Sequence, residues 1–183
     1  MIAILEGIDN CGKNSLATML SNKYDNVKII EFPDYNTDFG RFIKKQLESG
    51  GLSALSLQLL FSSERLSKVN ELKEMSEHKV VITTRYAYSA LAYGMARGID
   101  KQLLRLVENG MPDPDKKIYL KISVAESIKR SKNPDILERD SKLLSQVKSN
   151  YDQIVASDIN WHTVNAMGNI DNVFKEVEKI IFG

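Results

Sequence analysis

The sequence has little cysteine, histidine or proline and no long apolar run. Cys11 is the only cysteine among 183 residues, which excludes a disulfide framework and favours a reducing compartment such as the cytoplasm. No apolar run approaches the roughly 20 residues that a membrane-spanning helix needs. The first residues, MIAILEGID, contain five apolar residues before Glu6 and no basic start, unlike a signal peptide. We therefore expect a cytoplasmic protein with no membrane partner.

An excess of charge of one sign is also missing. Lysine and arginine number 25 and aspartate and glutamate 24, so the formal net charge is +1. A chain without a strong field is not expected to bind nucleic acid or an anionic membrane, and any phosphate ligand must be held by a local site. With 43% hydrophobic and 27% charged residues, the composition is that of an ordinary globular protein. We expect one domain over residues 1–183.

Short β-branched or aromatic runs alternate with longer amphipathic segments along the chain. Such alternation is typical of a parallel sheet with crossover helices. The expected strands cover residues 2–6, 27–32, 79–84, 117–122 and 161–165. The expected helices cover residues 14–24, 38–48, 53–77, 87–97, 101–108, 124–131, 140–157 and 170–181. Asp38 and Ser53 are expected N-caps and Gly98 a stop signal. The pattern predicts a three-layer α/β fold with about five parallel strands flanked by helices.

A glycine-rich loop follows the first expected strand and opens the first helix. Gly7, Gly12 and Lys13 have the spacing of a Walker A phosphate loop, in which backbone N–H groups and the helix N-terminus gather around phosphate. Lys13 is then expected to contact the β- and γ-phosphates of ATP as a catalytic residue. The alternative is a tight turn with an incidental lysine. The predicted ATP-binding residues are Gly7, Ile8, Asp9, Asn10, Cys11, Gly12, Lys13, Asn14 and Ser15.

Position 14 departs from the Walker A pattern. The loop lysine is normally followed by Ser or Thr, whose hydroxyl binds Mg²⁺, but here Asn14 and then Ser15 follow Lys13. An amide oxygen can bind a hard cation, although it lies farther from the backbone than a hydroxyl. Asn14 is therefore the candidate Mg²⁺ ligand, and we expect a metal site that is weaker or shifted.

Further motifs follow the loop in a fixed order. They are FPDYNTDFGRFI (32–43), LLFSSER (59–65), TRYAYSALAY (84–93), GMPDPD (110–115) and a basic stretch that ends in Glu138-Arg139. Together with the N-terminal LEGID, these motifs resemble thymidylate kinases along nearly the whole chain. The resemblance implies a P-loop kinase with a mobile lid near residues 129–140, which forms dTDP from dTMP and ATP in dTTP biosynthesis. It also implies Mg²⁺ as a cofactor and a homodimer.

The resemblance assigns an acceptor site as well. Phe61 and Arg65 lie four residues apart on an expected helix, so one face can stack on a pyrimidine and bind its edge. Without the resemblance, Phe61 would be read as core. Arg85 is implied to hold the acceptor phosphate and Asp9 to approach its 3′-hydroxyl, both as catalytic residues; the alternatives are a salt-bridge partner and a loop-bracing carboxylate. The implied acceptor set is Asp9, Phe32, Tyr35, Arg41, Phe61, Arg65, Arg85, Ser89 and Tyr93.

The expected lid carries the remaining catalytic candidates. Some family members have a catalytic arginine in the phosphate loop, where this chain has Asn10, and others supply basic residues from the lid. This chain resembles the second type, so Lys132 and Arg139 are implied to be catalytic. The alternative is a solvated helix face that carries these charges.

Three further departures leave alternatives open. Thr84 replaces an Asp linked to the metal, Tyr35 replaces the arginine of a Phe-Pro-x-Arg motif, and Gly94 replaces a glutamine that reads the base. The Mg²⁺ site could be rearranged around Asp34 or Asp9, the enzyme could be slow, or the protein could bind nucleotides without turnover. A kinase for another acceptor, such as dUMP or a deoxynucleoside, is the other alternative.

Overall fold

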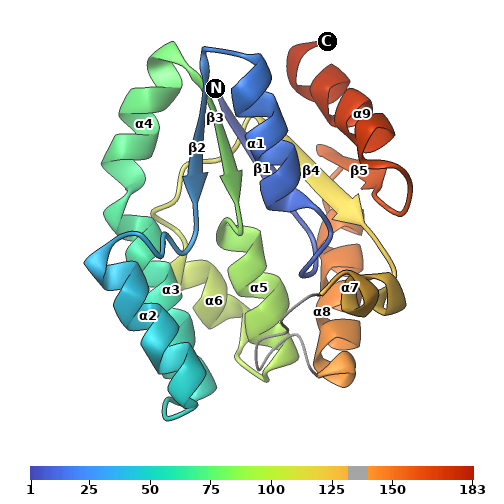
Figure 1. The fold of residues 1–183 in the computed structure, drawn as a ribbon. Helices are drawn as coiled ribbons and strands as arrows, with labels where there is room; N and C mark the ends of the chain where they lie inside the picture. Colours follow the sequence, from blue (N-terminus) through green and yellow to red (C-terminus); the bar gives the residue numbers. More distant parts are fainter. Residues whose placement is uncertain (132–139) are drawn as a thin grey trace.

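A computed structural model describes residues 1–131 and 140–183, and its five strands form one parallel sheet (Figure 1). The strand order is β2-β3-β1-β4-β5. The strands are β1 (Ile2–Glu6), β2 (Val27–Glu31), β3 (Val80–Thr84), β4 (Lys116–Lys121) and β5 (Trp161–Asn165). The predicted parallel α/β fold is therefore confirmed. Lys132, Arg139 and most of the expected lid lie outside the described residues.

Helices cover both faces of the sheet. In Figure 1, α1 and α9 lie on the near face, and α5 and α8 extend below the carboxyl ends of the strands. Tyr88 of α5 packs on Trp161 of β5, and Tyr151 of α8 stacks on Tyr119 of β4. The helices of the described ranges are α1 (Lys13–Lys23), α2 (Asp38–Ser49), α3 (Ala54–Ser67), α4 (Val69–His78), α5 (Ala87–Ala96), α6 (Lys101–Val107), α7 (Val124–Arg130), α8 (Ser141–Ala156) and α9 (Ile170–Phe182). No helix in the described part of the chain is both long and apolar enough to cross a membrane.

The central strands bring the loops of the site together. Every residue of β1 and β3 is buried, because helices cover both faces of a parallel sheet and each central strand then becomes an apolar run. Leu5 of β1 is in register with Thr84 of β3. The phosphate loop after Glu6 and the loop at Arg85 therefore leave the sheet side by side, at its carboxyl edge.

Some element boundaries differ from the predicted ones. The helix expected over 53–77 is two helices, because the backbone at Lys68 (φ −98°, ψ 3°) leaves the helical region. Asp38 is the first residue of α2 and not its cap; the Thr37 hydroxyl accepts the N–H of Gly40 instead, at 3.0 Å. Ser53 caps α3 as predicted, and Gly98 (φ 79°) follows the end of α5.

Candidate active site

The loop between β1 and α1 has the backbone shape of a phosphate cradle. Gly7 has φ 145°, and a Cβ atom there would lie 2.6 Å from the carbonyl oxygen of Leu120. Gly12 (φ 101°) begins α1 without a side-chain cap, so the first N–H groups of the helix face a ligand rather than a cap. Asn10 also has positive φ, 58°, which asparagine tolerates better than most residues.

Lys13 is folded back onto this loop. Its ammonium group donates to the carbonyl oxygens of Gly7 at 2.8 Å and Ile8 at 2.9 Å, and the residue is only 5% exposed. The charge therefore lies at the centre of the cradle, where a phosphate would compete with the carbonyl groups for it. The Cys11 thiol, 3.5 Å from the ammonium nitrogen, is turned into the protein and 1% exposed.

A cleft of about 500 Å³ opens from the loop, and we call it the donor cleft. Asn14 and Ser15 are exposed in it at the start of α1. Arg130, which was predicted only as part of the lid, also lines it and donates to the Ala166 carbonyl at 2.9 Å. The lining residues are Asn10, Cys11, Gly12, Lys13, Asn14, Ser15, Leu16, Arg85, Arg130, Ala166, Gly168, Ile170 and Val173.

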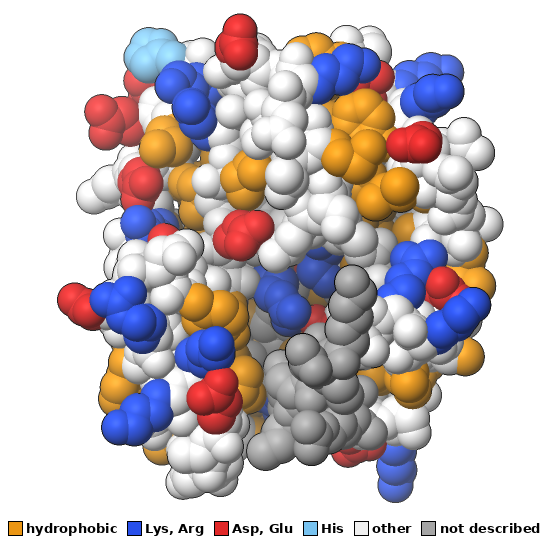
Figure 2. Space-filling view, in the orientation of Figure 1, with side chains coloured by type: hydrophobic (Ala, Val, Ile, Leu, Met, Phe, Trp, Pro, Cys, Tyr) orange, Lys and Arg blue, Asp and Glu red, His pale blue; other side chains and the backbone are white. Residues whose placement is uncertain are grey.

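A second cleft, the acceptor cleft, lies on the other side of Arg85. Figure 2 shows basic side chains gathered in a central hollow on this face of the molecule. Phe61 is half-buried, lines the cleft and is not part of the hydrophobic core. Arg97, which was not predicted, lines it too. The lining residues are Phe32, Pro33, Tyr35, Leu47, Gln58, Phe61, Arg65, Arg85, Ser89, Ala90, Tyr93 and Arg97.

Most of the predicted acceptor residues are brought together in this cleft, but Asp9 and Arg41 are not among its lining residues. Arg41 lies on the exposed side of α2, where it forms an ion pair with Asp38 at 2.5 Å. A role of Arg41 in acceptor binding therefore stays a prediction.

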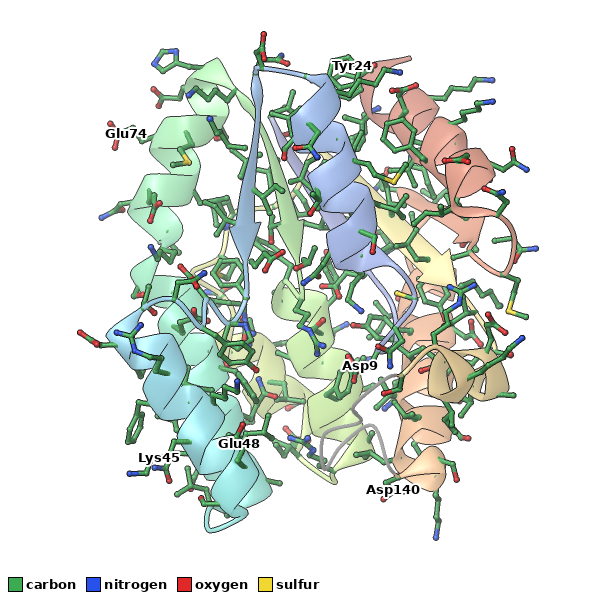
Figure 3. All side chains as sticks on the ribbon, viewed as in Figure 1. Asp9, Tyr24, Lys45, Glu48, Glu74 and Asp140 are labelled. Carbon is green, nitrogen blue, oxygen red and sulfur yellow. The ribbon has the colours of Figure 1, made fainter. Side chains whose placement is uncertain are left out.

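Asp9 joins the two clefts electrostatically. It is 2% exposed, and its carboxylate pairs with Arg85 at 2.5 Å and accepts the Tyr93 hydroxyl at 2.7 Å; Figure 3 shows it between α5 and α7. Burial alone would raise the pKa of Asp9, but the charges of Arg85 and Lys13 outweigh burial and hold the pKa below its ordinary value. Asp9 in turn raises the pKa of Arg85. The charged pair therefore stands between the donor and acceptor clefts.

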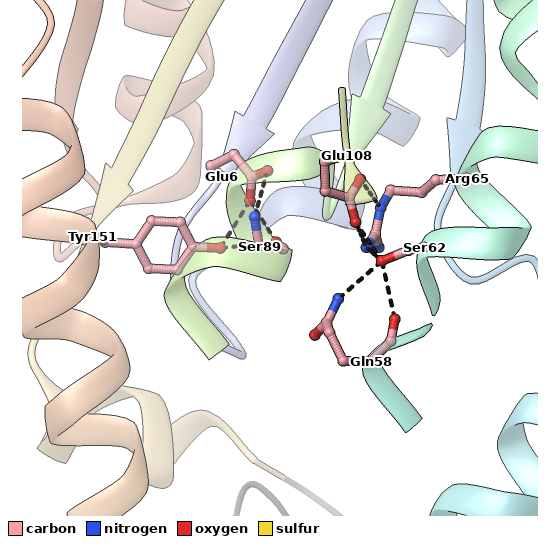
Figure 4. A network of polar contacts seen from close by, with 7 residues as sticks. All are labelled: Glu6, Gln58, Ser62, Arg65, Ser89, Glu108 and Tyr151. Atoms are coloured by element: carbon pink, nitrogen blue, oxygen red, sulfur yellow. Dashed lines mark hydrogen bonds and ion pairs between the residues drawn. The ribbon is translucent and has the colours of Figure 1, made fainter. Parts of the chain in front are cut away.

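A second carboxylate holds the other predicted arginine. Glu108, just after α6, accepts from Arg65 Nε at 3.0 Å and from Nη2 at 2.5 Å, in a pair that is almost fully buried. The Ser62 hydroxyl also donates to Glu108, at 2.5 Å (Figure 4). This two-pronged contact fixes the plane of the guanidinium group at the wall of the acceptor cleft. Glu108 was not predicted, because its partner is 43 residues away in the chain.

A third carboxylate lies beneath Ser89, which was predicted to belong to the acceptor site. The Ser89 hydroxyl is 2.6 Å from Glu6 Oε2, and the Tyr151 hydroxyl is 2.8 Å from the same oxygen. Glu6 is fully buried. Glu6 could have been indicated by the sequence, because it is a charged residue at the end of an otherwise apolar strand. No such signal marked Tyr151.

The chain matches the family described as thymidylate kinase over residues 5–177. The chain belongs to the thymidylate kinase family. A thymidylate kinase of Dictyostelium discoideum is 32% identical over 98% of this chain and 84% of its own length. A probable thymidylate kinase 1 of Saccharolobus solfataricus is 32% identical over 99% and 96%, respectively. The solved thymidylate kinase of Candida albicans has a TM-score of 0.84 at 28% identity and covers 98% of this chain and 90% of that one.

The departures from other thymidylate kinases have structural explanations at two positions. A Cβ atom at Gly94 would lie 2.7 Å from the Cδ atoms of Leu104, so this position packs against α6 and a glutamine there would require the Leu104 side chain to move. Thr84 is 1% exposed at the end of β3 and lies inside the sheet rather than in either cleft. Tyr35, in the place of the motif arginine, lines the acceptor cleft.

Proposed function

We propose that this thymidylate kinase family member transfers the γ-phosphoryl group of ATP to the phosphate of dTMP and releases dTDP and ADP. The observation that carries the proposal is that the donor and acceptor clefts share Arg85. Phosphoryl transfer needs the attacking and leaving oxygens in line, so catalysis depends on holding two nucleotides end to end. We place this activity in one domain, residues 1–183, that works on small nucleotides in the cytoplasm.

Each cleft supplies a different part of the reaction. Lys13 exchanges its contacts with the loop carbonyls for phosphate oxygens of ATP and offsets the charge that develops on transfer. Arg85 holds the acceptor phosphate, and Asp9 fixes the position of Arg85. Phe61 stacks on the thymine ring, and Arg65, held by its carboxylate partner, presents its guanidinium group to the base edge. The catalytic roles of Lys132 and Arg139 stay predictions from the sequence.

Mg²⁺ would enter the site together with ATP. The described residues contain no cluster of three or more His, Cys, Asp or Glu side chains that could hold a metal ion. The oxygen donors at the open end of the loop are the exposed side chains of Asn14 and Ser15. Because Mg²⁺ keeps several waters and binds substrate phosphates, these neutral donors fit an ion delivered by the nucleotide. Asn14 would hold it, and the ion would neutralise phosphate charge.

A coupled assay of ADP formation over a panel of acceptors tests the proposal. We expect dTMP to give the highest kcat/KM, and the Lys13→Ala variant to reduce the rate to background. The alternatives remain on the panel as dUMP, other nucleoside monophosphates and deoxynucleosides. The Candida albicans thymidylate kinase is described as having broad substrate specificity, so dUMP is the acceptor to compare first. Nucleotide binding without ADP formation above the variant's level would instead show a non-catalytic binding protein.

We also propose a homodimer formed through α3 and α6. Leu55 and Leu59 of α3 are exposed and lie one turn apart. Ser62, on the same face of α3, contacts Glu108 at the end of α6. On α6, Leu106 is 72% exposed. Apolar side chains grouped on neighbouring helices are typical of a protein–protein contact.

Sedimentation or light scattering tests this assembly. Leu59→Glu combined with Leu106→Glu should give a monomer, and Ile159→Glu, at a 98% exposed position outside these helices, should leave the dimer intact. A wild-type protein that is monomeric at micromolar concentration contradicts the proposal.

A further inference from the structure

The phosphate loop, the acceptor helix α5 and the helix α8 meet at one buried carboxylate. Glu6 is the last residue of β1, directly before the loop, and is fully buried. Its Oε1 accepts the Ser89 N–H of α5 at 3.2 Å, and its Oε2 contacts the hydroxyls of Ser89 and of Tyr151 of α8 (Figure 4). α8 begins directly after residue 140. Glu6 therefore links the strand that carries the phosphate loop to α5, which lines the acceptor cleft, and to α8.

Three oxygens around Glu6 form a closed triangle. Glu6 Oε2 is 2.6 Å from Ser89 Oγ and 2.8 Å from the Tyr151 hydroxyl, and the two hydroxyls are 2.8 Å from each other. All three distances are those of O–H···O hydrogen bonds. Each side of the triangle needs one proton, and the two hydroxyls supply only two.

The missing proton can come only from the carboxyl group. If Glu6 were ionised, both hydroxyls would donate to it, and their mutual 2.8 Å contact would join two oxygens with no proton between them. With a proton on Oε2, each of the three groups donates once and accepts once around the ring. The ring is then fully satisfied, as buried polar groups are expected to be.

The charged groups around Glu6 oppose this only in part. Lys13 of α1 is engaged by carbonyl groups of the phosphate loop, and Arg65 of α3 by its own buried carboxylate partner. Burial raises the pKa of Glu6; the two hydroxyls and the charges of Lys13 and Arg65 lower it by less, so that the pKa stays above the ordinary glutamate value.

We propose that Glu6 is kept as a neutral acid whose proton closes the ring with Ser89 and Tyr151, and that this ring is a clamp that positions α5 and α8 against the phosphate loop. Arg85 and Tyr93, which face the acceptor, lie on either side of Ser89 along the α5 segment. Loss of the clamp would therefore misalign the two nucleotides. A neutral Glu6 also adds no negative charge beside a site that must bind two negatively charged nucleotides. The kinetic part of this inference rests on the proposed kinase activity, whereas the protonation of Glu6 does not.

Infrared difference spectroscopy tests the proton without any assay of activity. The spectrum of the wild type minus that of Glu6→Gln, at neutral pH, should contain the C=O stretching band of a protonated carboxylic acid, shifted in D₂O. The matched control is Glu178→Gln, which removes a partly exposed carboxylate paired with Lys23 and should show only carboxylate bands. Absence of the acid band from the first spectrum overturns the proposal whatever the enzyme's activity.

The pH dependence of stability has a defined sign. The folded protein keeps a proton on Glu6 that the unfolded chain loses above about pH 4.3, so stability falls as the pH rises from there to the raised pKa of Glu6. Gln does not titrate. The Tm of Glu6→Gln relative to the wild type should therefore rise with pH over this interval, and a difference that stays constant with pH contradicts the neutral acid.

Two variants separate the clamp from a merely structural role. Glu6→Gln, whose amide can donate where the acid donated, should keep kcat within about threefold. Glu6→Met fills similar space but anchors neither hydroxyl. It should lower kcat by about tenfold to a hundredfold, because misalignment of the two nucleotides slows the transfer step. The KM for ATP should change by less than about threefold. Equal kcat values for the two variants, or a loss of Tm in Glu6→Met with unchanged kcat, overturns the clamp.

Discussion

The donor cleft and the acceptor cleft meet at Arg85 but are built from different kinds of contact. Seven consecutive residues, 10–16, supply much of the donor cleft, and its central contacts join one lysine to main-chain carbonyl groups. The acceptor cleft takes its side chains from segments far apart in the chain. Its two predicted arginines are each held by a distant carboxylate, Arg65 by Glu108 and Arg85 by Asp9.

This difference determines how each cleft can fail. A cradle made of main chain depends on backbone shape, so it tolerates side-chain changes except where a Cβ atom would collide, or where the loop lysine is lost. A cleft made of paired charges and a stacking ring depends on the identity of single side chains and on their protonation. Loss of the loop lysine in the donor cleft should therefore change kcat, whereas loss of the stacking ring in the acceptor cleft should change the KM for the acceptor.

The largest effect is expected from the donor cleft. Lys13→Ala should lower kcat by about a hundredfold or more, because the lysine stabilises phosphate charge that develops on transfer, while the fold is retained because alanine suits the first turn of α1. Steady-state kinetics and the unfolding curve measure both. Lys28→Ala, at an exposed position of β2, is the matched control. If the variant keeps more than a tenth of the wild-type kcat, the activation free energy has risen by less than about 1.4 kcal/mol, and this result contradicts the role of Lys13.

The acceptor cleft should respond in a different parameter. Phe61→Ala should raise the KM for dTMP by about tenfold to a hundredfold, since stacking on a base contributes about 1–3 kcal/mol, and should leave the KM for ATP within about twofold. Phe42→Ala, on the exposed side of α2, should change neither value. If both KM values rise together, or if the variant does not fold, Phe61 is a core residue and the two clefts are not independent.

A smaller effect tests the main-chain character of the donor cleft. Gly7→Ala should lower the free energy of unfolding by about 1–3 kcal/mol, because the new methyl group meets a carbonyl oxygen and φ is positive. Gly168 lines the same cleft, and a Cβ atom there would have no neighbour within 4 Å, so Gly168→Ala should change stability by less than about 0.5 kcal/mol. Chemical denaturation of the two variants measures the contrast, and similar values would show that the loop backbone is not constrained.

The smallest effect concerns pH and the charged pair of the acceptor cleft. The folded-state pKa of Asp9 is depressed, so the pair stabilises the fold above the ordinary aspartate pKa, and this contribution is lost as the pH falls through the lower, folded-state pKa. Asp9→Asn should cost about 1–2 kcal/mol at neutral pH, less than a fully buried pair because the Arg85 side chain is 39% exposed. The cost should shrink on acidification, as measured by denaturation at several pH values. A cost that does not depend on pH would show that Asp9 contributes by packing alone.

Prediction from the sequence succeeded where the signal was local. The strands were predicted to within a residue or two because helices on both faces make each central strand an apolar run. The break at Lys68 was missed, since neither Gly nor Pro marks it and the residues on both sides suit a helix. The cap of α2 was misplaced by one residue, from Thr37 to Asp38, because both side chains can cap and only the backbone conformation distinguishes them.

The sequence by itself determined the phosphate loop and the order of the elements, because a Walker A loop is a run of consecutive residues whose backbone preferences act locally. Only the tertiary structure decided which carboxylate holds which functional group. Glu6 and Tyr151 are 145 residues apart, and Arg65 and Glu108 are 43 apart. Such pairs form only when the sheet and its helices close the distance, and the free energy of burying a polar or charged group then requires that a partner be present there.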